Sequence, residues 1–555
     1  MKKMPAFGFS HIMVCLLMAS LVAAGVFHDY VACVFGAVCS VVLAVRLLRE
    51  KRLRMRNNLT VWTVGIILVS YGLSAMWAVD SGMAFIGFMK VLPVGLFLLL
   101  MLQEPNCKQV MIQVLPGTMA ALTAISALCS LIPGVAQYVL VADRLAGTMQ
   151  YPNTFALLLL VSQLLLVAQK KWNIPNILVM TVLLLGLVYS GSRTVFALAI
   201  PAHLVLALLQ GSKKQRLITA GAVLAGGALV LTVAALSGSA VLERFLRLSF
   251  SESTFAGRFL YWRDALIPIL KHPFGMGYYG YYYTQASVQT GVYATVFAHN
   301  DFLQLMLDVG WVPAVLLTVT ILKTLFGSKT KLAVKVILAV MFLHLCFDFD
   351  LQFNSVFFVL LLFLDTESGK EKVHKTGKVL PVVLCSLAVV CLYMGVALGL
   401  PQLGKSQAAR AMYAPNTQNN VQILLETEDP LLAQEILEQN EYVLLAHSVM
   451  ARHDFSQGNF TSLISRKREI FRLFPFQSEE YIQYCQMLLV GMELYSQAGD
   501  SGSADFCRQE LLQTADALQN LDQKLSPLGR AIADQPNTQL PEELMQAVAA
   551  LEVTG

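Results

Sequence analysis

The sequence predicts an all-α, polytopic helical membrane protein that carries a soluble α-helical domain at its C-terminal end. Of the 555 residues, 56% are hydrophobic and only 14% are charged, and the mean hydropathy is +0.62. Apolar runs recur that can cross about 30 Å of hydrocarbon, which takes roughly 20 helical residues. Segments of about ten residues with alternating polarity, which build a membrane β-barrel, are not found in the sequence.

The membrane domain is predicted to occupy residues 1–400, with about 12–14 transmembrane helices. The first apolar run follows Lys2 and Lys3, as in a signal peptide, but no clear small-residue cleavage site comes before the next run. We therefore count it as a helix. The predicted spans lie near residues 10–28, 30–47, 59–78, 84–102, 110–131, 154–169, 174–190, 193–210, 217–236, 301–326, 332–348, 353–365 and 379–400.

The distribution of basic residues predicts the orientation of these spans. Lys and Arg in short loops near span ends are retained in the cytoplasm. If the N-terminus is cytoplasmic, five basic connections fall on the cytoplasmic side. The long loop at residues 237–298 and the segment 401–555 are then extracytoplasmic. The basic connections contain Arg46, Arg49, Lys51, Arg52, Arg54 and Arg56; Lys170 and Lys171; Lys213, Lys214 and Arg216; Lys329 and Lys331; and Lys370, Lys372, Lys375 and Lys378.

The C-terminal segment differs from the rest in charge. Residues 401–555 hold 10 basic and 20 acidic residues, so the first 400 residues hold 30 basic and 15 acidic ones. Apolar residues recur at helical spacing, and "REIFRLFPFQSEEYIQYCQMLLVGMELYSQAGD" resembles one degenerate helix-turn-helix repeat of the tetratricopeptide kind. We expect an extracytoplasmic, tetratricopeptide-like helical domain, with an unspecialised helical bundle as the alternative.

The cysteines do not decide the compartment. Most of the ten lie in predicted spans, where cysteine behaves as a small apolar residue. Cys485 and Cys507 share the outer domain and can pair, although their spacing does not require it. The sequence contains no CxxC pair, no HExxH and no Walker loop, so we predict neither a metal site nor a cofactor, and no nucleotide-driven motor.

Several arginines fall on the predicted outer face, where the orientation rule disfavours them. Arg144 lies in "VADRLAGTMQYPNTFA", and Arg193 lies between "SGS" and an apolar helix. A charge at the membrane edge is costly without an anionic partner, and arginine's planar fork suits phosphate oxygens. Outward-facing Arg144, Arg193 and Arg258 would therefore form a diphosphate site. The alternative is snorkelling to lipid headgroups.

The long loop contains "GRFLYWRDALIPILKHPFGMGYYGYYY". Residues 257–269 are predicted to form a helix with Arg258 and Arg263 near its start, and the glycines that follow Pro273 permit sharp turns. The tyrosines at 278, 279, 281, 282 and 283 can stack on sugar rings or form an interfacial aromatic belt.

Ionisable groups also stand at the outer ends of two spans. "FAHNDFLQLMLDVG" places His299 and Asn300 before one span. In "FLHLCFDFDLQF", His344 and Asp348 are four residues apart, which predicts that they share one helical face and can hydrogen-bond. Such groups usually mark a functional site, although a structural pair that joins two helices is the alternative.

Together these stretches resemble the O-antigen ligase and polymerase superfamily of bacterial integral-membrane glycosyltransferases. The resemblance covers the membrane domain, through "RLAGTMQYPNTFA", "SGSRTVFALA", "GRFLYWRDAL", "AHNDFLQLMLDVG" and "FLHLCFDFDL". Members are similar to GT-C-type enzymes and transfer a glycan from undecaprenyl diphosphate to an acceptor outside the cytoplasmic membrane, without a nucleotide sugar or ATP. Some carry a C-terminal tetratricopeptide region.

The resemblance implies roles for individual residues. His299 matches the motif histidine and would activate the acceptor hydroxyl. Arg193 and Arg258, supported by Arg144 and Arg263, would hold the diphosphate and stabilise its developing charge. Asn300 would orient His299 or cap the helix. His344 and Asp348 would position the acceptor or His299. The diphosphate is an activated leaving group, so no metal is required in principle.

Other partners and functions stay open. The expected partners are membrane lipids, the lipid-linked donor and a glycan, lipid or protein acceptor, with protein partners for the C-terminal domain and no nucleic acid. The enzyme would be a ligase in polysaccharide or glycoconjugate assembly, or alternatively a repeat-unit polymerase. A glycolipid transporter or flippase would show broken helices and polar residues at mid-membrane. A membrane scaffold is the third class.

Overall fold

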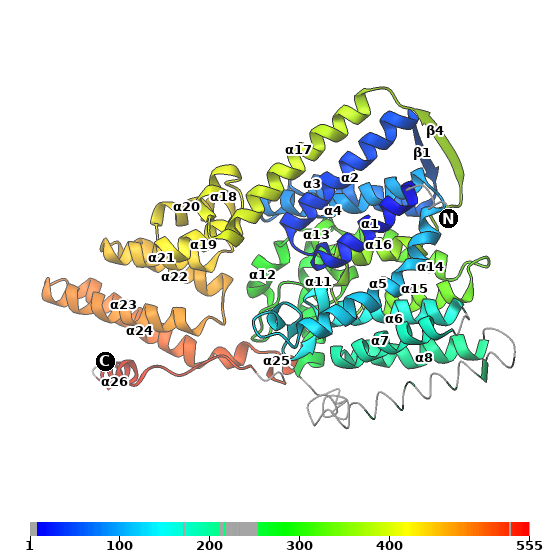
Figure 1. Cartoon of the computed structure of the whole chain (residues 1–555). Helices are drawn as coiled ribbons and strands as arrows, with labels where there is room; N and C mark the ends of the chain where they lie inside the picture. The colour runs from blue at the N-terminus through cyan, green and yellow to red at the C-terminus, as the bar shows by residue number, and fades with distance from the viewer. Residues whose placement is uncertain are drawn as a thin grey trace. The chain divides into compact units, whose positions relative to one another are not determined.

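The computed structural model describes residues 8–169, 173–209, 253–531 and 534–553, with scattered residues between 213 and 232. Helices dominate it, as predicted (Figure 1). The chain forms two compact units. The first contains residues 1–73, 85–249 and 299–400, and the second contains 74–84, 250–298 and 401–555. Lys170, Lys171, most of the predicted span 217–236 and the start of the 237–298 loop lie outside the described residues.

The first unit is built largely from apolar helices. Its elements are α1 (Phe9–Val22), η1 (Ala24–Val26), α2 (Asp29–Glu50), β1 (Arg52–Asn57), α3 (Leu59–Ser74), α4 (Ser81–Gln103), α5 (Cys107–Cys129), η2 (Ala136–Tyr138), β2 (Leu140–Val141), β3 (Arg144–Leu145), η3 (Gly147–Met149), α6 (Pro152–Gln169), α7 (Ile174–Ser190), α8 (Arg193–Leu209), α13 (Asp301–Val309), α14 (Trp311–Leu325), α15 (Leu332–Leu345), η4 (Asp350–Gln352), α16 (Asn354–Phe363), β4 (Lys370–Lys375) and α17 (Val379–Gly399).

The helical positions of the spans agree with the sequence. Among the described residues, five helices are long and apolar enough to cross a membrane, and seven apolar helices of 10–17 residues accompany them. Apart from 301–326, each predicted span within this part of the chain overlaps one helix over most of its length. The chain is therefore a helical membrane protein, while its likeness to GT-C-type enzymes stays a prediction.

One predicted span, 301–326, is wrong as a single helix. Gly310 separates α13 from α14 and adopts φ 89° and ψ −177°, a conformation that only glycine reaches at low cost. Asp308, just before the break, is completely buried. It accepts hydrogen bonds from the Tyr71 hydroxyl and the Gln304 amide, both at 2.8 Å. The break therefore places a buried but hydrogen-bonded carboxylate within the predicted span.

The centre of the first unit consists of α6 and α16. All ten residues of α16 are buried, and so are nearly all of α6. A helix that is hydrophobic all round belongs in a protein interior, where neighbours cover every face. Residues at the ends of these two helices are consequently held on the most rigid part of the unit.

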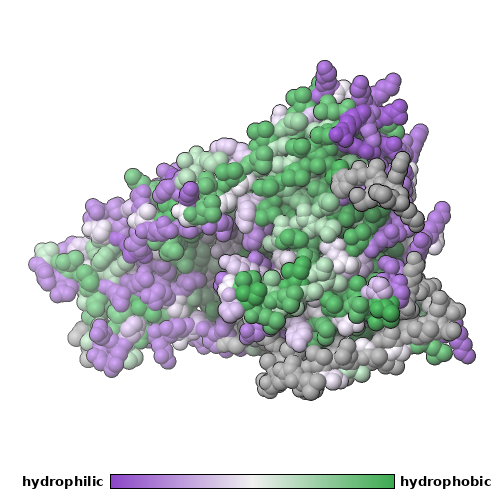
Figure 2. Space-filling model, viewed as in Figure 1, coloured by the Kyte–Doolittle hydropathy of each residue, from purple (hydrophilic) through white to green (hydrophobic). Residues whose placement is uncertain are grey.

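Two outer helices have the opposite character. α17 packs along α2, where Gly395 allows close approach because a Cβ there would stand 3.0 Å from Val34. Both helices leave many large apolar side chains exposed. Figure 2 shows the apolar surface over α2 and α17 and the hydrophilic surface beyond their ends at the strands. An exposed apolar face of this kind suits contact with lipid.

Two of the predicted basic loops pair as a small antiparallel sheet, which the all-α prediction did not include. β1 pairs with β4, and Arg56 lies opposite Glu371 with an ion pair of 2.8 Å. Hydrogen-bonded strands lie on one side of a membrane, so both basic loops share a side, as the predicted topology requires. α16 runs from η4 towards β4, so the strand pair and η4 lie towards opposite ends of this helix.

The described residues of the second unit form helices joined by loops, with no strand among them. It contains α11 (Ser253–Lys271), α12 (Gly280–Val288), α18 (Ser406–Met412), α19 (Thr417–Thr427), α20 (Pro430–Gln439), α21 (Leu444–Ser456), α22 (Phe460–Leu473), α23 (Ser478–Gln497), α24 (Ser501–Gln519), α25 (Pro527–Arg530) and α26 (Glu542–Val553).

The helices of the C-terminal segment pack in chain order. α20, α21 and α22 contact their neighbours in sequence, and α23 packs against α24 around a core that includes Tyr484, Leu488 and Leu511. This order fits a helical-repeat domain, and the tetratricopeptide identity stays a prediction. Cys485 and Cys507 are buried free thiols, so the open question of their pairing is answered in the negative. Burial raises the pKa of the Cys485 thiol to about 12.

Asp80 anchors the C-terminal segment to the α3–α4 connection within the second unit. Its carboxylate is 1% exposed and caps α4 by accepting from the Met83 amide at 2.9 Å. It also accepts hydrogen bonds from Thr417, from Gln439 at 3.0 Å and from Asn440 at 3.1 Å. A buried carboxylate with this many donors is expensive to remove, because the donors lose their partner.

We therefore predict that Asp80→Ala loosens the C-terminal segment. A hydrogen bond to a charged group contributes about 1.5–3 kcal/mol, so trypsin cleavage at Lys405 and Arg410 should accelerate by about tenfold or more. Limited proteolysis of the full-length protein in detergent measures this rate. Asp505→Ala, at an exposed position of α24, is the matched control. Equal cleavage rates in both variants would contradict the anchoring role.

Candidate functional site

The candidate site is organised around the pair His299 and Asp348 in the first unit. Nδ1 of His299 lies 3.3 Å from Oδ1 of Asp348, and the imidazole is 24% exposed whereas the carboxylate is 1% exposed. Because a carboxylate accepts, this contact requires a proton on Nδ1, and in the neutral imidazole the lone pair is then on Nε2. His299 also has a φ of +49°, in the left-handed region that few residues adopt outside functional sites and turns.

Asn300 fixes the direction in which the chain leaves His299. Its side-chain oxygen accepts hydrogen bonds from the amides of Phe302 and Leu303, both at 3.0 Å, so it is the N-cap of α13. Its amide donates to the carbonyl of Cys346 at 2.9 Å, after the end of α15. Of the two roles expected from the sequence, the structure shows the cap.

Asp348 receives two further hydrogen bonds from residues at the start of α6. The Tyr151 hydroxyl donates to Oδ1 at 2.7 Å, and the Asn153 amide donates to Oδ2 at 2.8 Å. The ring of Tyr151 also packs on Phe349, with centroids 4.7 Å apart. Asp348 is therefore buried beneath the groups that it binds, and the imidazole of His299 is one of these groups.

Arg144 continues this chain of hydrogen bonds. Its Nη2 donates to the Asn153 side-chain oxygen at 2.7 Å, and its Nε donates to the carbonyl of Ser190 at 2.7 Å. His299, Asp348, Tyr151, Asn153 and Arg144 are called the Asp348 network below. Through it, the sequence-predicted Arg144, His299 and Asp348 are brought together.

The turn between α7 and α8 lies beside Arg144. Gly191 ends α7 with a φ of +58°, and a Cβ at this position would stand 3.6 Å from Nε of Arg144. Arg193 is the first residue of α8 and is half-buried. The hydroxyl of Ser192 is buried and has no hydrogen-bond partner within the described part of the chain. A helix N-terminus with arginines and an unsatisfied hydroxyl is suited to an anion.

The predicted helical pair of His344 and Asp348 is wrong. α15 ends at Leu345, so the two residues do not share a helical face. His344 instead bonds Asp350, with 2.5 Å between Nδ1 and Oδ2, and both side chains are completely buried. Thr154 of α6 donates to the same carboxylate at 2.6 Å. His344 therefore ties α15 to η4 and, through Asp350, to α6, while its predicted role toward the acceptor stays a prediction.

The remaining predicted residues, Arg258 and Arg263, lie on α11 in the second unit. Arg258 is half-buried and Arg263 is exposed. Asp264 follows Arg263 on α11 and is buried. Its carboxylate accepts hydrogen bonds from the amide and the hydroxyl of Thr290, in the loop after α12, both at 2.8 Å. The approach of Arg258 to the Asp348 network stays a prediction.

Lys90 is a residue that the sequence reasoning missed. It lies within the apolar run of α4, is 3% exposed, and its ammonium lies 3.2 Å from Asp29 and 2.7 Å from the Phe27 carbonyl. Phe27 stacks on Phe353, with centroids 4.6 Å apart. A charged residue within an apolar span usually marks a functional or structural site, and this signal in the sequence could have identified Lys90. Lys90 holds the α1–α2 connection against the aromatic residues that surround the site.

Comparison with known proteins gives a match to one protein family over part of the chain. Residues 178–319 match a protein-family model described as O-antigen ligase. Arg193, Arg258, Arg263, His299 and Asn300 fall within the matched segment, while Arg144, His344 and Asp348 fall outside it. No curated protein matches the chain.

The hydrogen bond from Tyr151 to Asp348 predicts a loss of stability when the Tyr151 hydroxyl is removed. Tyr151→Phe deletes the hydrogen bond to buried Asp348 and should lower the free energy of unfolding by about 1–3 kcal/mol. Thermal unfolding of the purified protein in detergent measures the change. Tyr138→Phe, at a tyrosine that is 59% exposed, is the matched control and should have no effect. Identical midpoints for the two variants would mean that Asp348 does not depend on Tyr151.

Proposed function

We propose that this chain, which matches the O-antigen ligase family over residues 178–319, is a glycosyltransferase of that family. It would transfer a glycan from undecaprenyl diphosphate to an acceptor. The reaction would take place on the outer face of the cytoplasmic membrane. The observation that carries this proposal is the hydrogen bond between partly exposed His299 and buried Asp348, in one network with Arg144.

His299 has the chemistry of a general base in this arrangement. Nε2 would take the proton of an acceptor hydroxyl while the hydroxyl oxygen attacks the anomeric carbon of the donor. The bond from that carbon to the diphosphate oxygen breaks, and the lipid diphosphate leaves with the electron pair. Asp348 would stabilise the imidazolium that forms, as a carboxylate does for histidine in other hydroxyl-activating sites.

The leaving diphosphate requires positive charge. Arg144 is held by Ser190 and Asn153, so its guanidinium is already oriented before a ligand binds. Arg193 begins α8, and the Ser192 hydroxyl beside it supplies a hydrogen-bond donor for a phosphate oxygen. Arg258 is proposed to complete this set from the second unit, with Arg263 in a supporting role.

The membrane orientation is part of the proposal. Loops rich in Lys and Arg pair as β1 and β4, towards one end of α16, and Asp350 of η4 precedes its other end. If the basic strands are cytoplasmic, the Asp348 network opens on the extracytoplasmic side. A lipid-linked donor presents its sugar and diphosphate at that membrane edge. The N-terminus would then be cytoplasmic and the C-terminal domain extracytoplasmic.

The same site serves a ligase or a polymerase, since both reactions join an acceptor hydroxyl to the anomeric carbon of a lipid-linked glycan. We favour a ligase that acts on a separate acceptor. The helical C-terminal domain would contact the acceptor or a partner enzyme.

One observation favours a transporter as the second candidate. The break at Gly310 and buried Asp308 are features that transporters place at their substrate sites. Asp308, however, is hydrogen-bonded by Tyr71 and Gln304, so the protein itself satisfies this carboxylate. A transporter would move the lipid-linked glycan without forming a glycosidic bond, which the experiment below detects.

We predict that His299→Ala reduces glycan transfer by about 10²–10⁴-fold and leaves donor binding intact, since general-base catalysis contributes about that factor. The assay follows a radiolabelled undecaprenyl-diphosphate oligosaccharide with purified protein and separate candidate acceptors. His374→Ala, on exposed β4, is the matched control. A ladder of longer lipid-linked products would identify a polymerase, and one shifted acceptor a ligase. Full transfer by His299→Ala, or no transfer by wild type, would contradict the proposal.

We also predict that the transfer proceeds without a divalent metal ion. The diphosphate is already an activated leaving group, and arginines would supply the charge that stabilises it. Initial rates should therefore be unchanged after dialysis against EDTA. A rate that falls with EDTA and recovers on addition of Mg²⁺ or Mn²⁺ would refute this part of the mechanism.

A further inference from the structure

The second unit contains a groove that is lined by none of the residues of the Asp348 network and has the chemistry of a binding site. Its volume is about 490 Å³, within the range of small-molecule sites. It is formed by α12 and the residues that follow it, together with parts of α19 and α21 and the connection between α22 and α23. The lining residues are Tyr282, Tyr283, Gln285, Ala286, Gln289, Tyr293, Ala294, Gln418, Val421, Tyr442, Val443, Leu444, Leu445, Phe474 and Gln477. This set is called the tyrosine groove.

One buried hydroxyl in the lining of the groove is unsatisfied. Tyr283 is 7% exposed, and its hydroxyl has no hydrogen-bond partner in the described part of the chain. A buried hydroxyl without a partner costs free energy unless a ligand or water satisfies it. Around it, the side-chain amides of Gln289, Gln418 and Gln477 each present donors and an acceptor.

The walls of the groove are held in place before a ligand binds. The Gln285 amide donates to the Thr295 carbonyl at 2.6 Å, and its oxygen accepts from the Thr295 amide at 3.2 Å. The Tyr293 hydroxyl donates to buried Asp264 at 3.1 Å. α12 also packs against α22. A preformed groove reduces the ordering cost of binding.

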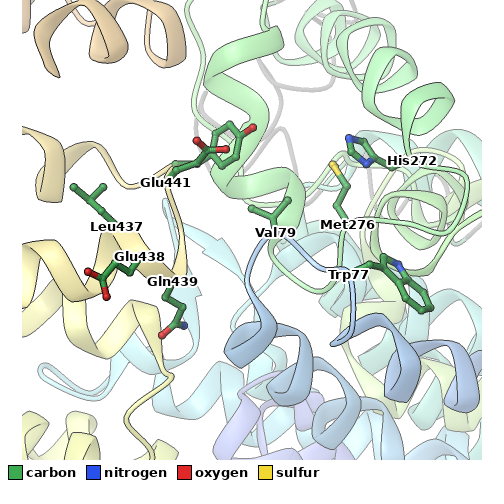
Figure 3. Close-up of a pocket in the computed structure, with 9 residues that line it drawn as sticks. Trp77, Val79, His272, Met276, Leu437, Glu438, Gln439 and Glu441 are labelled. Carbon is green, nitrogen blue, oxygen red and sulfur yellow. The ribbon is translucent and has the colours of Figure 1, made fainter. Parts of the chain in front are cut away.

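The lining contains neither an acidic nor a basic residue. A second cavity, of about 370 Å³, shares Tyr442 with the tyrosine groove, and its acidic members are exposed Glu438 and Glu441. Figure 3 shows these carboxylates on the segment that also carries Leu437 and Gln439, with His272, Met276, Val79 and Trp77 on the other segments that line the cavity. A ligand that extends past Tyr442 meets carboxylates, which accept hydrogen bonds from hydroxyls and repel anions.

We propose that the tyrosine groove binds an uncharged oligosaccharide segment. Aromatic rings cover the apolar faces of sugar rings, and amides and a hydroxyl bond the hydroxyl groups at their edges. The absence of charge in the lining and the carboxylates beyond Tyr442 select against phosphate- or carboxylate-bearing sugars. Calling this glycan a substrate rests on the proposed function, whereas its binding does not.

The test is glycan binding by the full-length protein in detergent. An array of neutral and anionic bacterial oligosaccharides identifies the ligand, and calorimetry with the best neutral oligosaccharide gives the affinity. Tyr283→Phe should weaken binding by about fivefold, and the double variant Gln289→Ala with Gln477→Ala by tenfold or more, from the loss of hydrogen bonds. Tyr495→Phe and Gln513→Ala, outside the groove, are the matched controls.

The outcomes separate the proposals. Binding of the free oligosaccharide assigns the groove to an acceptor glycan, and binding only when the same oligosaccharide is linked to undecaprenyl diphosphate assigns it to the donor. Binding confined to anionic glycans or to peptides, no glycan binding, or equal affinities in groove and control variants would overturn the inference. Glycan binding without transfer to any acceptor would leave the groove standing and remove the proposed function.

Discussion

Asp348 brings a carboxylate to a place that water does not reach, where a charge is costly unless it is fully hydrogen-bonded. Tyr151 and Asn153, next to the start of α6, and His299, next to the start of α13, meet this requirement. Since the carboxylate binds all three, satisfying its charge also fixes the position of the imidazole. Arg144 is drawn into the same arrangement through Asn153. The geometry of the site is therefore a consequence of burying one negative charge.

The scaffold explains why the charge can be held there. α6 and α16 are buried on every side, and the polar residues stand at their ends, where backbone groups and side chains of neighbouring helices supply partners. Asp350 is a second buried carboxylate of this kind, and it is hydrogen-bonded by Thr154 of α6 and His344 of α15. Towards the other end of α16, β1 and β4 join two basic segments. The unit thus has a polar, acidic and histidine-containing end and a strongly basic end, which is the asymmetry that a fixed orientation in a membrane requires.

Hydropathy alone located the helices, because any segment that crosses a bilayer must be long and apolar whatever its neighbours are. The same measure missed the break at Gly310, since the apolar pattern continues from α13 into α14. Sequence motifs located His299, Arg144 and Asp348 but assigned His344 to the wrong carboxylate, because α15 ends three residues before Asp348. The partnership of Asp348 with Asn153 joins residues 195 positions apart, and local periodicity carries no information about it. The pairing of β1 with β4 was missed for the same reason.

In the proposed mechanism, Asp348 acts by orienting His299 for proton transfer. Asp348→Asn tests it most directly, because the amide preserves the shape of the side chain and removes its charge. Single-turnover glycan transfer should fall by at least about 10²-fold while the affinity for the lipid-linked donor is unchanged, because loss of the orienting carboxylate has this effect on the rate in hydroxyl-activating triads. Transfer at the wild-type rate by Asp348→Asn would mean that the carboxylate does not orient His299 for proton transfer.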